Sequence, residues 1–171
     1  YETFDEDARI VSRELDLTLT SRGTGRNGER IPLAGVPVHA AESYIARLVE
    51  KGYRVAICEQ LEDPKTAKGV VKRGVVRVVT PGTAMEPGIL TSPAARYLAG
   101  IAPSRKKGGG FGLAWLDCTT GEFFVMETGP EESEVAGAIA RNPPAEIVTP
   151  PSLPERIQQL LGESGAVLTP R

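Results

Sequence analysis

The chain has 171 residues, of which 40% are hydrophobic and 25% are charged, and its formal net charge at pH 7 is −2. This composition can form one or two hydrophobic cores, and it excludes wholesale disorder. No apolar run approaches the roughly 20 residues of a membrane span, so we expect no membrane partner. The net charge by itself does not favour nucleic-acid binding, so any such function has to rest on local patterns.

The first predicted element is an amphipathic helix. Its apolar residues recur at spacings of four, three and four, namely Phe4, Ala8, Val11 and Leu15. Asp5 lies in the first turn, where a carboxylate can cap free backbone amides. Apolar and polar residues then alternate over residues 15–20, which predicts a half-buried strand. The glycine-rich residues 21–30 predict a flexible loop.

The next predicted elements are a short strand, a helix and two longer strands. Residues 31–38 are apolar, but two prolines and a glycine interrupt them, so we expect an edge strand and not a central one. Residues 41–49 have the spacing of a second helix, which ends at Gly52. Strands are predicted at residues 53–61 and 75–80, with a basic loop between them.

The second half of the chain predicts a separate α/β layer. Residues 85–88, Met-Glu-Pro-Gly, indicate a domain boundary. Beyond them we expect strands at 97–102, 111–119, 122–127, 146–149 and 166–169, and helices at 131–141 and 153–161. The first three strands are expected to be antiparallel, with a tight turn at Thr120-Gly121. Three such strands followed by alternating helix and strand is the element order of an RNase-H-like fold.

Basic residues gather in two predicted loops. Residues 65–80 contain five lysines and arginines and no acid, and residues 21–30 contain three arginines against one acid, Glu29. Such patches can hold phosphate groups, although solvated surface charge explains them equally well. The charge pattern alone therefore leaves both interpretations open.

Cysteine and histidine usage limits the chemistry that the chain can perform. Cys58 and Cys118 lie far apart inside apolar strand-like runs, which predicts reduced core thiols of a cytoplasmic protein. His39 is the single histidine, which excludes most histidine-based metal sites. The sequence also lacks the GxxxxGKS or GxxxxGKT pattern of a phosphate-binding loop. We therefore expect no catalytic residue, metal site or cofactor in this chain.

Several sequence blocks resemble one protein family. They are Tyr1-Glu2-Thr3-Phe4, Leu17–Gly23, Ile31–Ala40, Val55–Gln60 and Val78–Thr83. In this order and spacing they resemble the start of the MutS family of mismatch-repair proteins, over about residues 1–90. A looser resemblance to the connector domain of that family covers residues 111–154, mainly through Leu116–Glu122 and Asn142–Glu146.

The resemblance implies a domain organisation and a set of partners. Residues 1–86 would form a small mixed α/β mismatch-recognition domain with its first strand truncated, and residues 93–171 an RNase-H-like α/β connector domain. The implied ligand is double-stranded DNA with mismatched or unpaired bases, and the implied protein partners are a second MutS subunit and MutL. The parent protein would be an ATPase that uses ATP and magnesium in a domain beyond Arg171. The chain itself is expected to be no enzyme.

The resemblance also implies a recognition motif, Phe-x-Glu. Tyr1 and Glu2 match its second and third positions, and the phenylalanine would precede Tyr1. In the expected mechanism an aromatic wedge enters the minor groove and kinks the duplex, which costs less at a weakly stacked mismatch. Side chains alternate along a strand, so Glu2 would face the same base as the phenylalanine. Without that ring we expect poor mismatch binding, while Tyr1 packs against the domain.

Further DNA contacts are implied for two arginines and one turn. Arg22 matches a family position that is expected to hold the phosphate backbone, and Arg73 looks like a second such position. A family segment close to the DNA is matched here by Leu33, Gly35, Val36 and Pro37. Looser electrostatic contacts are expected from Arg26, Arg30, Lys68 and Lys72.

Two alternatives compete with this interpretation. RNase-H-like folds often carry metal-binding acids, so a nuclease would need Asp117 together with Glu122 and Glu146, none of which lies in a recognisable acidic motif. We expect Asp117 to anchor the hairpin turn instead. The second alternative is a pure protein-interaction module, which fits the slightly acidic connector half and is compatible with the main interpretation.

Overall fold

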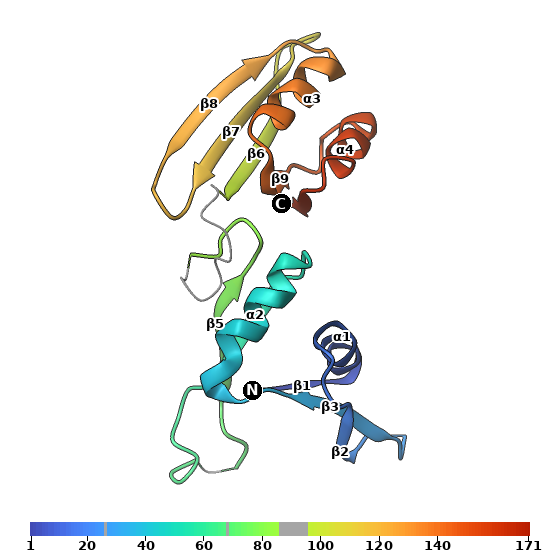
Figure 1. Ribbon diagram of the computed structural model, residues 1–171, viewed down its shortest axis with the longest axis vertical. Coiled ribbons are helices and arrows are strands. Elements are labelled where there is room, and N and C mark those ends of the chain that lie inside the picture. The colour runs from blue at the N-terminus through green and yellow to red at the C-terminus, as the bar shows by residue number, and fades with distance from the viewer. Residues whose placement is uncertain (26, 68, 86–95) are drawn as a thin grey trace. The chain divides into compact units, whose positions relative to one another are not determined.

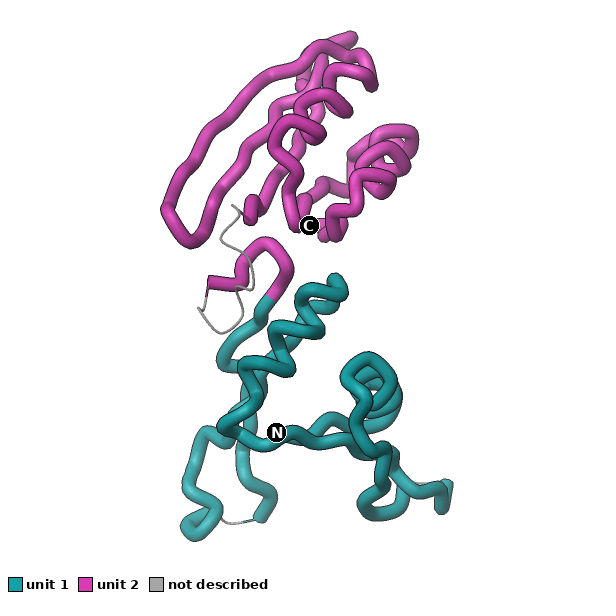
Figure 2. Tube along the Cα trace, in the orientation of Figure 1, with its two compact units in different colours: residues 1–79, 86–91 teal, residues 80–85, 92–171 magenta. Residues whose placement is uncertain are grey.

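The computed structural model describes residues 1–25, 27–67, 69–85 and 96–171, which form two compact units (Figure 2). The first unit is Tyr1–Val79, and the second combines Thr80–Met85 with the described part of Ser92–Arg171. The domain boundary expected at residues 85–88 falls mainly on Glu86, Pro87 and Gly88, which lie outside the described residues. Among the described residues, no helix is long and apolar enough to cross a membrane. The mixed α/β class expected from the sequence is confirmed.

The three-stranded sheet of the first unit has β3 in its centre. β1 (Glu2–Phe4), β3 (Arg30–Gly35) and β2 (Thr20–Thr24) lie side by side in this order, and both pairings are antiparallel. The expectation of an edge strand at 31–38 is therefore wrong. β1 ends at Phe4, opposite Leu33. On its β1 side, Pro32 therefore has no partner, and its nitrogen has no hydrogen that such a partner could accept.

α1 (Asp5–Leu15) confirms the first predicted helix, although both of its ends differ from expectation. Phe4 occupies the N-cap position without a side-chain hydrogen bond, and Asp5 lies in the helix with φ 53°, so the predicted cap by Asp5 is wrong. At the other end Asp16, with φ 57°, turns the chain out of the helix. The strand expected at residues 15–20 begins only at Thr20 and continues into the expected loop as far as Thr24, because β2 pairs with β3.

The second half of the first unit follows the predicted order. A short 3-10 helix, η1 (Val38–Ala40), leads into α2 (Ala41–Glu50), and Gly52 then turns the chain with φ 85°. β4 (Val55–Gln60) and β5 (Arg73–Val79) form a two-stranded antiparallel ribbon. The predicted helix and both strands are thus confirmed. Buried apolar side chains of this unit include Ala8, Leu15, Leu33, Ala34, Ala41, Ala46, Leu48 and Val49.

A charged cluster around Glu14 joins α1 to the end of α2. The Glu14 carboxylate accepts hydrogen bonds from Lys51 Nζ at 2.9 Å, from Arg13 Nε at 3.1 Å and from the Tyr53 hydroxyl at 3.1 Å. These donors, Lys51 first among them, lower the pKa of Glu14 to about 2. The cluster was not expected from the sequence, because two of its members lie far along the chain from Glu14.

Acidification should weaken the first unit through this cluster. Glu14 titrates near its ordinary pKa of 4.5 in the unfolded chain and at about 2 in the folded chain. Its stabilising contribution is therefore complete above pH 4.5 and is lost as the pH falls from 4.5 towards 2. In urea unfolding at pH 7, Glu14→Gln should lower the midpoint relative to the parent chain, and the two midpoints should converge towards pH 2. A difference that stays constant over this range would contradict the prediction.

The second unit is a five-stranded sheet with both of its helices on one face (Figure 1). Its elements are β6 (Tyr97–Pro103), β7 (Phe111–Asp117), β8 (Phe123–Thr128), α3 (Glu132–Arg141), β9 (Pro144–Thr149), α4 (Glu155–Gly162) and β10 (Val167–Pro170). The strand order is β10-β9-β6-β7-β8, in which β6, β7 and β8 are antiparallel neighbours and β9 runs parallel to β6 and β10. This topology confirms the RNase-H-like order, and each predicted helix and strand is present.

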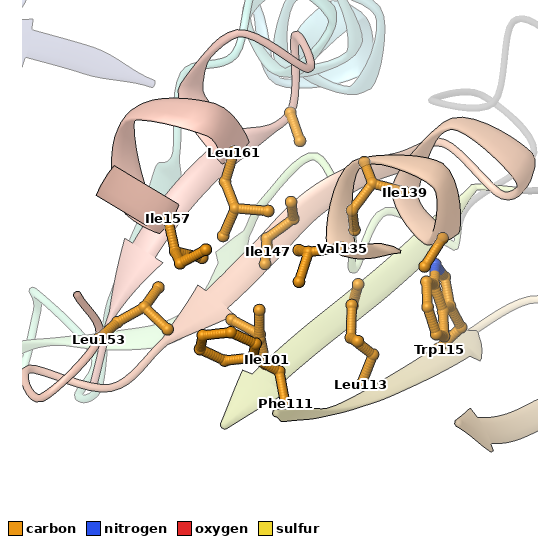
Figure 3. Close-up of a cluster of buried hydrophobic side chains, with 13 residues drawn as sticks. Ile101, Phe111, Leu113, Trp115, Val135, Ile139, Ile147, Leu153, Ile157 and Leu161 are labelled. Atoms are coloured by element: carbon orange, nitrogen blue, oxygen red, sulfur yellow. The ribbon is translucent and has the colours of Figure 1, made fainter. Parts of the chain in front are cut away.

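One hydrophobic core fills the space between this sheet and its helices (Figure 3). Trp115 of β7 is fully buried in it, and its ring stacks on Phe124 with the centroids 5.1 Å apart. The Trp115 Nε1 donates to the Asn142 carbonyl at 2.9 Å, so the polar atom of the indole is also satisfied. Val135 of α3 and Ile157 of α4 pack into the same core from the helix side.

Among the described residues of this unit, no helix covers the opposite face of the sheet. Small residues, among them Gly100, Gly112 and Ala114, line a shallow apolar hollow there. Side chains alternate along β8, so Phe124 enters the core while Phe123 and Val125 point to this open face, where they are exposed. The second unit therefore presents an apolar surface to its surroundings.

The two cysteines do not lie in the cores, contrary to expectation. Cys58 of β4 is exposed, Cys118 after β7 is half-buried, and both thiols are free. Cys58 is exposed because β4 belongs to a ribbon of only two strands, on which alternate residues face solvent. Burial raises the pKa of the Cys118 thiol.

Candidate nucleic-acid interface

Glu2 lies at the exposed end of the three-stranded sheet. It is paired with Gly35 of β3, and its side chain is 46% exposed. The ladder extends one residue towards the N-terminus, because the Tyr1 nitrogen donates to the Val36 carbonyl at 2.8 Å and the Val36 amide donates to the Tyr1 carbonyl at 2.9 Å. The Glu2 carboxylate is thus held by paired backbone and still faces solvent, where a ligand can reach it.

Arg22 lies beside this carboxylate. β1 and β2 flank β3, and the Arg22 Nη1 lies 3.2 Å from Glu2 Oε1 and 3.3 Å from Glu2 Oε2. The arginine side chain is 70% exposed, and an ion pair this open to solvent contributes little to stability. Either partner can therefore exchange the other for a ligand. Nothing in the sequence links residues 2 and 22; their strands bring them together.

The segment Leu33–Pro37 is only partly at the surface. Leu33 is 8% exposed and packs in the first unit, so its predicted DNA contact is at odds with its burial. Gly35 is exposed, and a Cβ atom there would lie 3.3 Å from the Tyr1 carbonyl oxygen, so glycine allows β1 to approach closely. Val36 is half-buried and Pro37 is exposed. Gly35 and Pro37 are thus the accessible positions of this segment.

Tyr1 packs partly against its own unit, and 42% of the residue stays exposed. It lines an apolar pocket with Tyr44 of α2 and Val55 of β4, and its hydroxyl donates to the Glu59 carboxylate. This hydrogen bond raises the pKa of the Tyr1 hydroxyl. Glu59 was missed from the sequence, because a contact between residues 58 positions apart leaves no periodic signal. Anchoring of Tyr1 holds the start of β1, and with it Glu2, in place.

Arg73 lies on the β4–β5 ribbon and not on the sheet of Glu2 and Arg22. It begins β5 opposite Gln60, is exposed, and has no side-chain hydrogen bond or ion pair with another described residue. Its guanidinium is therefore available to an external anion. Whether it holds DNA together with Arg22 stays a prediction, since the two residues share no sheet.

The basic loop before Arg73 is held by two acids that precede it. The Glu62 carboxylate accepts from the Lys72 amide at 2.6 Å, and the Asp63 carboxylate accepts from the Lys65 amide at 2.9 Å. These bonds use backbone amides, so both lysine side chains stay exposed. In the other basic loop, the Arg30 guanidinium donates to the Ser21 hydroxyl at 3.5 Å. Arg26 and Lys68 lie outside the described residues.

The three acids that a nuclease would need already have partners. Asp117 Oδ1 accepts from the Thr119 hydroxyl at 2.6 Å and from the Thr119 amide at 2.8 Å, which anchors the hairpin turn and lowers the Asp117 pKa. Glu122 accepts from the Tyr97 hydroxyl at 3.0 Å, and Glu146 is bonded to three donors of its own unit. Within the described ranges, no group of three or more His, Cys, Asp or Glu is placed to hold a metal ion.

Comparisons with known proteins match both parts of the chain. The family model of MutS domain I matches residues 1–87, and that of MutS domain II matches residues 96–171. A DNA mismatch repair protein MutS of Methanosarcina acetivorans is 51% identical over 163 residues, which cover 90% of this chain and 18% of that protein.

Two further relatives carry the same name. The protein of Symbiobacterium thermophilum is 54% identical over 155 residues, which cover 90% of this chain and 17% of the relative. That of Pelotomaculum thermopropionicum is 48% identical over 167 residues, which cover 96% of this chain and 19% of the relative. The chain thus spans less than a fifth of the length of these relatives.

Proposed function

The chain belongs to the MutS family, and from this premise we propose that it is the part of a MutS protein that binds mismatched or unpaired bases in double-stranded DNA. The observation that carries the proposal is the exposed Glu2 carboxylate beside the Arg22 guanidinium, inside the region that MutS domain I matches. A carboxylate can accept a hydrogen bond from a base, and an arginine can hold the phosphate next to it. Two strands of one sheet, β1 and β2, thus offer both kinds of contact side by side.

We propose that recognition uses an aromatic wedge next to Glu2. Since Tyr1 pairs with Val36, a residue before Tyr1 would lie opposite Pro37 and on the same side of the strand as Glu2. The family motif has phenylalanine at this position. A ring there would enter the minor groove and unstack a base step, at a cost of a few kcal/mol. Mispaired bases are already poorly stacked, so deformability and not base sequence would give the preference.

Backbone contacts would supply most of the affinity. Arg22 and Arg73 are exposed and are proposed to hold phosphate groups, which gives sequence-independent and salt-dependent binding. Gly35 and Pro37, the accessible part of their segment, are proposed to lie close to the duplex beside the wedge. The exposed lysines of the basic loop would add weaker, screened attraction.

We propose that the second unit is a connector that transmits the DNA-bound state and contacts other proteins. Its helix-free sheet face leaves Phe123 63% and Val125 66% exposed, which suits a protein contact. The proposed partners are the rest of the MutS protein, a second MutS subunit and MutL, in the cytoplasm. ATP hydrolysis with magnesium is proposed for the longer protein. No catalytic step is proposed for this chain, and the existing partners of Asp117, Glu122 and Glu146 support that choice.

The test compares duplexes that differ only in one unpaired or mispaired base. The chain with a phenylalanine added before Tyr1 should bind the mismatched duplex at least about tenfold more tightly than the matched one, because each 1.4 kcal/mol of saved deformation is a factor of ten. The chain that begins at Tyr1 should discriminate less. Fluorescence anisotropy at one fixed salt concentration measures both affinities. Equal affinity of the extended chain for the two duplexes would refute the proposal.

A further inference from the structure

A buried carboxylate holds the segment Thr80–Met85 on the second unit. Glu146 of β9 is only 3% exposed. Its Oε2 accepts from the Thr80 hydroxyl and from the Gly82 amide at 3.1 Å, and its Oε1 accepts from the Thr169 hydroxyl of β10 at 2.7 Å. A carboxylate is an acceptor, so three donors around it match its chemistry. Such a group is tolerated in a protein interior when it is hydrogen-bonded in this way.

The bound segment is a closed turn. The Thr83 amide donates to the Thr80 carbonyl at 3.1 Å, and the hydroxyls of the two threonines lie 2.7 Å apart. Pro81, Gly82 and Ala84 are buried. The turn is therefore packed along its length as well as hydrogen-bonded at Glu146.

Glycine at position 82 permits this close packing. A Cβ atom on Gly82 would lie 2.9 Å from the Glu146 Cβ and 2.9 Å from the Leu98 Cδ1. A Cβ atom does not approach a non-bonded carbon this closely, so any residue larger than glycine would push the turn away from the carboxylate. The backbone conformation of Gly82 does not itself require glycine, because its φ is not among the positive ones.

We infer that Glu146 is a positioning residue that clamps the Thr80–Thr83 turn to the connector sheet, so that β5 passes into the second unit without a free linker residue. β5 ends at Val79, and the next residue along the chain, Thr80, is already bonded to Glu146. Release of the turn would add its residues to the linker. The clamp would act in this way whichever ligand the first unit binds.

Amide hydrogen exchange of the full 171-residue chain tests the clamp. Glu146→Met keeps a side chain of similar length and removes both acceptors. It should speed exchange of the Gly82 and Thr83 amides by about 10- to 100-fold, the factor expected for one hydrogen bond to a charged group. Glu146→Gln keeps one acceptor for Gly82 and presents a donor that the Thr169 hydroxyl can accept, so it should recover most of the protection. Gly82→Ala should resemble Glu146→Met.

Asp117→Ala is the matched control. Asp117 is also 3% exposed and ends a strand of the same sheet, but its side-chain hydrogen bonds with described residues all go to its own hairpin. Its loss should speed exchange at Thr119 and leave Gly82 unchanged. Amides of β7 report whether the sheet is intact. If Glu146→Met unfolds the sheet, the inference is tested instead by the exchange rate of the amide at position 82 in Gly82→Ala, compared with the parent chain.

Two results would overturn the inference. One is unchanged exchange at Gly82 in Glu146→Met or Gly82→Ala while the amides of β7 stay protected. The other concerns the linker. When the turn is released, ¹⁵N relaxation should give shorter rotational correlation times for both units, because a longer linker lets them tumble more independently. Faster exchange at Gly82 with unchanged correlation times would show that the clamp does not limit the linker.

Discussion

Replacing Glu2 by alanine should lower the affinity of the phenylalanine-extended chain for a mismatched duplex by about 10- to 100-fold, the factor for one hydrogen bond to a charged group. The affinity for the matched duplex should stay nearly the same. The reason is that the Glu2 carboxylate is exposed and would accept its bond only from a base that is displaced from the stack. In a matched duplex the bases stay stacked, and the carboxylate meets no donor on a base. Anisotropy titrations with the two duplexes measure the ratio directly.

Variants at Glu2 and Arg22 separate base recognition from backbone binding. Glu2→Gln keeps an acceptor without the charge, so it should retain part of the preference. Arg22→Gln should weaken binding to both duplexes by a similar factor and reduce the salt slope by about 1, as expected for one lost phosphate contact. If Glu2→Ala weakens both duplexes alike, the carboxylate acts through its ion pair with Arg22 and not on a base.

Truncation of Trp115 should destabilise the second unit by about 3–5 kcal/mol, the usual range for removing a buried aromatic side chain. Trp115 is fully buried, stacks on Phe124 and donates to the Asn142 carbonyl, so alanine leaves a cavity and an unpaired carbonyl. Urea unfolding followed by circular dichroism measures the loss for Trp115→Ala. Fluorescence can follow the parent chain only, because Trp115 is its single tryptophan.

Phe123 offers the matched control for this truncation. It is an aromatic residue on the neighbouring strand β8, but it is 63% exposed on the helix-free face. Phe123→Ala should therefore change the free energy of unfolding by no more than about 0.5 kcal/mol. A loss for Phe123→Ala as large as that for Trp115→Ala would mean that the open face of the sheet is part of the packed structure.

Short-range patterns determined most of the secondary structure. The stripe of α1 and the strand-like runs of β7 and β8 depend on residues close together in the chain, and these elements are found where the sequence predicts them. A tight turn was predicted at Thr120-Gly121 for the same reason, and the structure has a turn there that closes between Asp117 and Glu122. The short blocks that indicate the MutS family are local as well, and the family matches agree with them.

Pairing between distant segments overrode several local signals. β3 lies in the centre of its sheet although Pro32 favours an edge, because β1 is short enough to leave Pro32 unpaired on the β1 side. Residues of the expected glycine-rich loop form β2, because pairing with β3 satisfies their backbone groups. Intrinsic preferences in these segments are weak compared with a row of backbone hydrogen bonds.

The sequence by itself determined the family, the element order and the individual candidates Glu2, Arg22 and Arg73. Only the tertiary structure decided that Glu2 and Arg22 lie together while Arg73 lies on another sheet, and that Leu33 is buried. It also decided that Glu146 holds Thr80, a residue 66 positions away. The physical reason is that periodicity records which face of an element is buried, whereas ion pairs and buried hydrogen bonds form between elements that only the folded chain brings together.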